Sequence, residues 1–422
     1  SGSRVMPFSP YDGGVHTGPM VADLGLWDAY RTHLPLYFLL FPSRGSTILQ
    51  GLVNAYREGG WFPKWASPGY RRGMPGTQAE IIFADAWSEN ARDFDVEIAY
   101  EGLLKNATVP GDESRGRLGL AAYDRLGYVP ADLVEGSVSR TLEFAYADFC
   151  VALMARVLGH GAEAERYLQR SSNWRQVFDP SSGFVRGRNA DGSWAPLDPY
   201  SWGGPFVEGN AWHYTWAVPH DIPGLADALG GRGALAAKLD SFLLAPTTVH
   251  TGTYGRMIHE MNELQYSSTG QYAHGNQPCH HVLYLYDHTD SAWKTAPLVR
   301  TIGDHLYKAT PDGYPGDEDT GSLGSWYVFT ALGLYPIQPG APTYALGAPR
   351  FRRAELAFEN GRTLVVEAVG VEEPGAIYVQ SVSMDGDRLL APFIEHQRLL
   401  RGGTLRFEMG TAPKMDVYPS VP

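Results

Sequence analysis

Helix-length apolar patterns follow one another along most of this chain, from residue 19 to residue 340. Apolar side chains recur at intervals of three and four residues, and glycine or proline ends most of these segments. The predicted helices cover residues 27–42, 46–60, 78–90, 93–106, 138–158, 161–178, 211–218, 224–229, 233–244, 278–286, 291–307 and 324–333. Such a series of helical hairpins, joined by long polar loops, predicts an (α/α)6 toroid with its functional site in the central funnel.

The sequence pattern changes after residue 340, where alternating apolar and polar residues replace the helical period. Strands are expected at residues 351–359, 363–371, 376–384 and 404–410, with hairpin turns at Asn360-Gly361 and Asp385-Gly386. Residues 1–18 are rich in glycine, serine and proline and are typical of an irregular segment. We therefore expect a lead-in at 1–18, a helical catalytic domain at 19–340 and a C-terminal antiparallel β element at 341–422.

The charge of the chain restricts its partners. It carries 46 acidic against 34 basic residues, a formal net charge of −12. Nucleic acids and anionic membrane surfaces bind through basic patches, so neither is an expected partner. Aromatic residues make up 12% of the chain. They suit the apolar faces of sugar rings, although a large core would also use them.

An acidic loop precedes the last predicted helix. It contains Asp312, Asp317, Glu318 and Asp319 within eight residues that also include glycine and proline. Because a helix N-terminus favours negative charge, we expect Asp317 and Asp319 to stay ionised at neutral pH. Such carboxylates suit a general base that deprotonates water or ligands for a hard cation, while an ordinary helix cap would use the same residue types.

A second carboxyl group lies in an aromatic environment. Glu208 belongs to the segment PFVEGNAWHYTWAVPHD at residues 205–221, which also contains Trp212. Apolar surroundings raise the pKa of a carboxyl group by desolvation, as a general acid requires. No serine or threonine precedes Glu208 by three residues, so a capping box does not explain it.

Two further segments carry polar side chains in suggestive patterns. In LWDAYR, helical spacing puts Asp28 and Arg31 on one side, either as an exposed salt bridge or as part of a binding site. Four histidines lie at positions 259, 274, 280 and 281 without the His-Glu-x-x-His spacing of a zinc site. Oxygen donors are plentiful there instead, and Asn262, Glu263 and Gln277 are of the kind that calcium prefers.

These motifs, in this order, resemble glycoside hydrolase family 92, the calcium-dependent exo-α-mannosidases that invert the anomeric centre. The resemblance covers nearly the whole chain from Trp27 onward. It implies that Glu208 is the general acid and that Asp317 and Asp319 supply the general base. It also implies a bound calcium ion with ligands among Asn262, Glu263 and Gln277.

The resemblance extends to substrate binding. The implied sugar-binding residues are Trp27, Asp28, Arg31, Trp212, His259 and Glu260. The last two look like the pair that contacts the next sugar in enzymes that cleave α-1,2 linkages. The expected activity is therefore removal of terminal mannose, with an α-1,2 preference, from mannans or high-mannose N-glycans.

Two alternatives remain at this point. One is a mannosyl-phosphate hydrolase of the same family, whose departing phosphate would need no acid such as Glu208. The other is a non-catalytic, calcium-dependent mannan-binding module. Family members carry an N-terminal β-sandwich, so the resemblance implies such a partner as a separate chain or a missing segment. It also implies a secreted or cell-surface bacterial protein.

Overall fold

The computed structural model of the 422-residue chain describes residue 6 and residues 8–419. Two compact units can be distinguished, and they interleave along the sequence. Unit 1 comprises Ser1–Tyr30, Pro42–His220 and His250–Arg256. Unit 2 comprises Arg31–Phe41, Asp221–Val249 and Met257–Pro422, so the C-terminal strands belong with helices from the middle of the chain.

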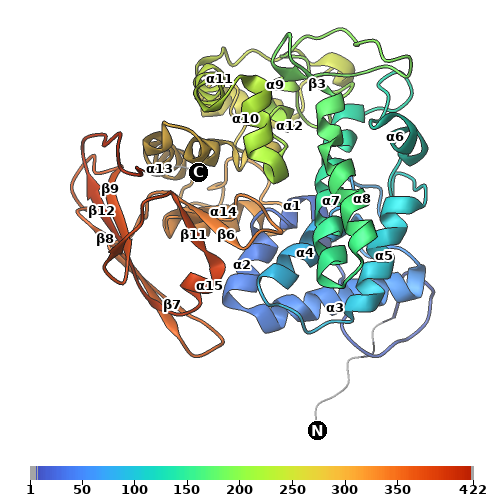
Figure 1. Cartoon of the computed structure of the whole chain (residues 1–422), viewed down its shortest axis with the longest axis horizontal. Coiled ribbons are helices and arrows are strands. Elements are labelled where there is room, and N and C mark those ends of the chain that lie inside the picture. Colours follow the sequence, from blue (N-terminus) through green and yellow to red (C-terminus); the bar gives the residue numbers. More distant parts are fainter. Residues whose placement is uncertain (1–5, 7, 420–422) are drawn as a thin grey trace. The chain divides into compact units, whose positions relative to one another are not determined.

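Unit 1 is built around one long helix, α7 (Ser137–Val157), most of whose residues are buried. In Figure 1, α8 (Gly161–Arg170) lies beside α7, and α4 (Ala79–Ser88) and α5 (Val96–Thr108) also contact it. The other helices of this unit are α1 (Leu26–Ala29), α3 (Pro42–Gly59), α6 (Leu120–Leu126) and α9 (Ala211–Tyr214). Two short antiparallel pairs complete it: β1 (Leu24–Gly25) with β2 (Trp65–Ala66), and β3 (Phe178–Asp179) with β4 (Phe184–Val185).

A cluster of charged side chains lies inside unit 1 between α4 and α7. The fully buried Arg117 donates to Asp148 at 2.6 Å and to Glu80 at 3.2 Å. Tyr123 and Arg170 also donate to Asp148, at 3.0 and 2.9 Å. Because a buried charge without a partner is costly, this cluster holds the two helices in one arrangement.

Unit 2 combines helices with two sheets. Its α-helices are α2 (His33–Leu40), α10 (Ile222–Leu229), α11 (Arg232–Leu244), α12 (His259–Ser267), α13 (Thr295–Leu306), α14 (Ser322–Ala331) and α15 (His396–Leu399). The larger sheet, red and orange in Figure 1, has the order β10-β9-β12-β8-β7, and the smaller has the order β11-β6-β5. Their strands are β5 (Leu334–Tyr335), β6 (Thr343–Leu346), β7 (Arg353–Ala357), β8 (Thr363–Val369), β9 (Tyr378–Met384), β10 (Asp387–Arg388), β11 (Phe393–Glu395) and β12 (Gly403–Gly410).

The sheets and helices of unit 2 share one hydrophobic core. Alternate residues of β8 point inward, and Leu364 and Val366 are fully buried. Leu39 of α2 and Phe329 of α14 belong to the same cluster. The C-terminal strands are therefore stabilised by apolar side chains from helices far away in the sequence.

Several predicted helices differ from the observed ones. Residues 27–42 do not form one helix, because α1 ends at Ala29 and α2 begins at His33. Pro42 does not stop a helix but is the first residue of α3, a position where the missing N–H costs nothing. The predicted helix at residues 278–286 is a series of 3-10 turns, and the one at residues 211–218 ends at Tyr214.

Other elements had no counterpart in the sequence prediction. Helices α6 and α12 and the short strands β5, β6, β10 and β11 were not expected. The four predicted strands appear as β7, β8, β9 and β12, and both predicted turns join neighbouring strands. One pairing departs from the antiparallel expectation, since β12 runs parallel to β8 while it runs antiparallel to β9.

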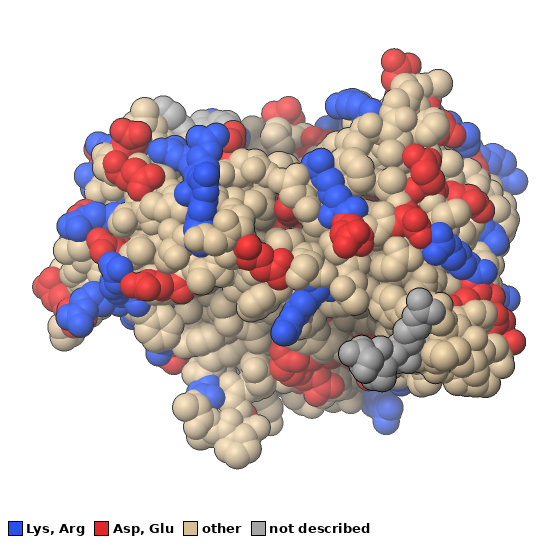
Figure 2. Space-filling model, turned by 90° about the horizontal axis from the view of Figure 1, so that it is seen from below, with Lys and Arg blue, Asp and Glu red and all other residues tan. Residues whose placement is uncertain are grey.

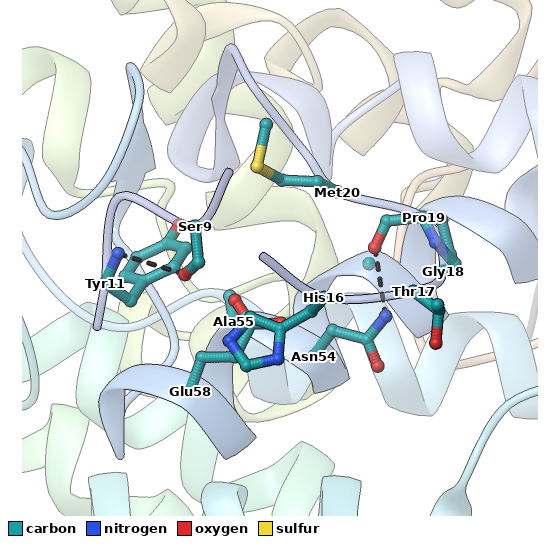
Figure 3. A pocket seen from close by; sticks show the side chains of 11 residues that line it. Ser9, Tyr11, His16, Thr17, Gly18, Pro19, Met20, Asn54, Ala55 and Glu58 are labelled. Carbon is teal, nitrogen blue, oxygen red and sulfur yellow. Dashed lines mark hydrogen bonds between the residues drawn. The ribbon is translucent and has the colours of Figure 1, made fainter. Parts of the chain in front are cut away.

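On the face drawn in Figure 2, basic and acidic side chains are interspersed. Within the described part of the chain, no helix is both long and apolar enough to cross a membrane. Residues 9–20 lie against α3, and Asn54 of this helix donates to the carbonyl of Pro19 at 3.0 Å (Figure 3). The pocket between them, about 260 Å³ with its mouth, contains none of the predicted site residues.

Candidate active site

Glu208 lies in a loop that is held by hydrogen bonds from three sides. Its own N–H donates to the hydroxyl of Tyr254 at 2.9 Å. The preceding Val207 donates its N–H to Ser139 at 3.0 Å and accepts a hydrogen bond from the hydroxyl of Tyr214. These contacts come from α7, α9 and the segment near residue 254, so the position of the loop is set by distant parts of unit 1.

The backbone at two of the three predicted catalytic positions is unusual. Glu208 has φ 46° and Asp319 has φ 55°, in the left-handed region that ordinary residues avoid. In the described part of the chain, six non-glycine residues have positive φ: Asn90, Glu208, Ser268, Asp319, Thr320 and Asp385. Asn90 and Ser268 follow helices, and Asp385 is in a hairpin turn. Glu208, Asp319 and Thr320 lie in loops and are neither helix ends nor hairpin turns. Strained backbone of this kind concentrates at functional sites.

The segment around Trp27 is buried, not exposed. Trp27 and Asp28 lie in α1 and are 1% and 2% exposed, which rules out the exposed salt bridge considered above. The indole N–H of Trp27 donates to Glu143 at 3.0 Å, and Gln78 donates to the same carboxylate at 3.1 Å. Arg31 follows the end of α1 in a turn and is also buried, so Asp28 and Arg31 do not lie in one helix as predicted.

Helix α12 places three predicted residues on one cluster in unit 2. His259 contacts Glu263 through Nδ1 at 2.8 Å and Glu260 through Nε2 at 3.0 Å. Its Nε2 is also 4.0 Å from Asp317. Burial alone would lower the pKa of His259, but the bond to Glu263 and the surrounding carboxylates outweigh it and raise that pKa. The cluster therefore favours a protonated imidazole between acidic groups.

The acidic loop and α14 meet in a way that the sequence did not predict. Glu318, and not Asp317 or Asp319, accepts hydrogen bonds from the N-terminal amides of α14, from Gly321 at 2.7 Å and from Gly324 at 2.9 Å. Asp317 is exposed, whereas Asp319 is mostly buried and accepts a hydrogen bond from Gln277. The role of helix cap thus falls to Glu318.

Burial sets the protonation of Asp319. Desolvation raises its pKa to about 6, against the hydrogen bond from Gln277, which lowers it. The nearby charge of Asp317 raises it further. Asp319 is still mostly ionised at pH 7, and burial governs its pKa in place of the helix terminus, which Glu318 occupies.

The carboxyl group of Glu263 is the centre of the predicted cation site. Burial raises the pKa of Glu263, and among the described residues nothing hydrogen-bonds its Oε2. A Cβ on Gly275 or Gly316 would lie 2.4 or 2.7 Å from this oxygen, so only glycine leaves room beside it. The donor set is oxygen-rich and fits a hard cation, although Asn262 is exposed and donates to Ile258 of its own helix. Among the described residues, no three His, Cys, Asp or Glu side chains are arranged to hold a metal ion by themselves.

The sequence model of the glycosyl hydrolase family 92 catalytic domain matches residues 1–411. The chain belongs to this family. The resemblance drawn from the motifs is therefore confirmed.

Several relatives of this family 92 chain are similar over nearly its whole length. A family 92 inverting mannosidase from Bacteroides thetaiotaomicron is 40% identical to this chain, with a TM-score of 0.90. The match covers 99% of this chain and 57% of the mannosidase. A family 92 α-mannosidase from the same bacterium, solved with mannoimidazole, is 28% identical with a TM-score of 0.89, covering 97% and 54%. An uncharacterized secreted glycosidase from Arthroderma benhamiae is 29% identical in an alignment 399 residues long, which covers 85% of this chain and 48% of that protein. The chain thus spans about half the length of these relatives.

Four residues of the family 92 chain emerge only from the structure. Glu143 accepts from Trp27 and from Gln78, Tyr254 accepts from the N–H of Glu208, and Glu318 caps α14. Only Glu318 carried a sequence signal, since it lies among the predicted acids. Trp212 is buried with its ring edge-on to Phe184 at 4.7 Å, and its predicted sugar contact stays a prediction.

Proposed function

We propose that this chain is the catalytic part of a secreted, exo-acting α-mannosidase that inverts the anomeric centre and prefers α-1,2 linkages. The observation that carries the proposal is the 40% identity and TM-score of 0.90 to a solved inverting mannosidase. We also propose that its helices form an (α/α)6 toroid.

In this proposal Glu208 is the general acid. Its protonated carboxyl donates to the oxygen of the departing sugar while the C–O bond breaks. The hydrogen bonds around Val207 and Glu208 fix the loop, so the acid is positioned before substrate arrives. A raised pKa for Glu208 remains part of the proposal.

We assign the general base to Asp319 in preference to Asp317. A pKa of about 6 leaves Asp319 ionised at neutral pH while keeping it more basic than an exposed carboxylate. Gln277 orients its carboxylate by donating to one oxygen, which leaves the other to accept the proton of the attacking water. Asp317 then supplies negative charge beside His259 and Asp319.

The remaining predicted residues bind substrate and a cation. Trp27, Asp28 and Arg31 contact the terminal mannose, and His259 and Glu260 contact the sugar that follows it. Calcium would be held by Glu263 and Gln277. Asn262 is the weakest member of the set because it is exposed and its amide nitrogen donates to the carbonyl of Ile258. When bound, the cation supplies positive charge that holds and orients sugar hydroxyl groups.

A panel of mannobioses that differ in linkage tests this proposal. The α-1,2 isomer should be cleaved fastest, and β-mannose should be the first product seen by proton NMR. Glu208→Gln should lose mannobiose cleavage and keep turnover of α-mannosyl fluoride, whose leaving group needs no proton. Release of α-mannose would reject inversion. Equal losses on both substrates would remove Glu208 from the role of acid.

A further inference from the structure

A groove of about 850 Å³ lies on unit 2, apart from every residue assigned a catalytic or binding role above. It is lined by residues 307–314, which belong to the connection between α13 and α14, by Tyr327 and Val328 of α14, and by Arg350. The volume is that of a site for a small molecule or a short chain segment.

The floor of the groove is aromatic and rigid. Tyr307 stacks on Trp326 at 5.7 Å, and its hydroxyl bonds His274 at 2.8 Å. Tyr314 meets Tyr307 edge-on at 6.0 Å, and Tyr327 lies 4.8 Å from it. Three tyrosines held in this way offer ring faces and edges without losing much freedom when a ligand binds.

The loop that carries Tyr314 is fixed by its backbone. The N–H of Lys308 donates to the carbonyl of Gly313 at 3.0 Å and closes the loop. The hydroxyl of Tyr314 lies over Gly324, where a Cβ would be 3.3 Å away. Even so, Tyr314 is 47% exposed, so a large part of its side chain faces solvent beside the groove.

The charges around the groove are balanced. Arg350 pairs with Asp304, which also accepts from Arg300 at 3.0 Å. Thr310 lowers the pKa of Asp312 through a hydrogen bond, and the nearby charge of Lys308 lowers it further. Arg350 and Lys308 each have an acidic neighbour, Asp304 and Asp312 respectively. Their charges are therefore balanced and do not favour a phosphate, sulfate or uronate group. The groove offers hydrogen-bond donors to an uncharged ligand.

We infer that this groove is a second carbohydrate-binding site, which takes a segment of a neutral α-mannan and has no part in bond cleavage. Aromatic rings match the apolar faces of pyranose rings, and Lys308 and Arg350 can donate to hydroxyl groups. The identity of the glycan rests on the proposed function. Tyr314 is three residues before Asp317, so one loop would hold a polymer and carry the acidic residues.

The test measures retention of the full chain in gels containing a soluble α-mannan, with excess mannose present to occupy the proposed active site. Tyr314→Ala should weaken retention about tenfold, the effect of losing one aromatic contact, and Tyr314→Phe should restore it. Tyr266→Ala removes a tyrosine that is 85% exposed and outside the groove, so it should retain normal binding. Cleavage of α-1,2-mannobiose should be unchanged in all three variants.

Other outcomes would overturn either the second binding site or the proposed enzyme, and the two cases can be told apart. Unchanged retention of Tyr314→Ala, stronger binding of polygalacturonate than of mannan, or Tyr314-dependent self-association without mannan binding would overturn the inference. Parallel loss of mannobiose cleavage in Tyr314→Ala would do the same, by placing Tyr314 in the catalytic site. A chain that is inactive on every mannobiose but depends on Tyr314 for mannan retention would reject the proposed enzyme and keep the groove.

Discussion

The left-handed backbone at Glu208 predicts that glycine at this position is more stable than alanine. An ordinary residue in this region costs about 1–2 kcal/mol because its Cβ approaches the following carbonyl. Glycine avoids that cost but loses about 0.5–1 kcal/mol more backbone entropy on folding. The free energy of unfolding of Glu208→Gly should therefore exceed that of Glu208→Ala by roughly 0.5–1 kcal/mol. Both variants lack the carboxyl group, so its contacts cancel in the comparison.

Urea unfolding of the two variants, followed by tryptophan fluorescence, measures this difference. Neither variant should cleave α-1,2-mannobiose, and both should turn over α-mannosyl fluoride, because fluoride leaves without a proton. If the glycine variant also loses turnover of the fluoride, the fixed backbone of the loop contributes to catalysis beyond supplying the acid.

Asn90 provides the matched control. It is exposed, follows α4 and has φ 66°, and it lies in unit 1 like Glu208. Asn90→Gly should likewise be more stable than Asn90→Ala, with full activity in both. Equal stability of the two variants at position 208, together with a clear difference at position 90, would refute the left-handed geometry of Glu208.

Three further predictions concern the buried charges and the cation. Arg117→Leu should lower the free energy of unfolding by about 3–5 kcal/mol, because Glu80 would stay buried without its cation and Asp148 would lose one of its two arginines; a loss below ~1 kcal/mol in urea unfolding would contradict this. Hydrolysis of α-mannosyl fluoride should fall as the pH drops through about 6, because the base is the ionised form of Asp319 and burial raises its pKa to about 6; a limb near pH 4 would assign the base elsewhere. Chelation should abolish activity, and calcium should restore it better than zinc or magnesium; full activity of protein shown to be metal-free by elemental analysis would exclude the cation.

The elements with long apolar segments or regular alternation could be predicted from the sequence. Helices α4 and α7, which are buried over most of their length, and strands β8 and β9, whose buried side chains largely alternate, appear within a few residues of their predicted bounds. Helix α12 was missed because only Glu260, Met261 and Leu264 are buried in its nine residues. With so short an apolar face, tertiary contacts decide its conformation, and periodicity gives no signal.

The partners of the candidate site residues could not be predicted, for a different reason. The bonds of Trp27 to Glu143, Glu208 to Tyr254 and Gln277 to Asp319 join residues 116, 46 and 42 positions apart. Motifs identified Trp27, Glu208, Gln277 and Asp319 from their local sequence, but not the partner of any of them. The pairing is determined by how the helices pack, and residue spacing does not encode that.

The acidic loop shows how one residue of difference changes the chemistry. Asp319, Thr320 and Gly321 all have positive φ, so the chain turns sharply before α14 begins at Ser322. This turn lets Glu318 reach the amides of Gly321 and Gly324 and satisfy the helix terminus. Asp319 is then not needed as a cap, and burial raises its pKa where a cap would have a lowered one. A carboxylate with a pKa near 6 is a stronger base than an ordinary helix cap, so the strained turn itself creates the group that the proposed reaction requires.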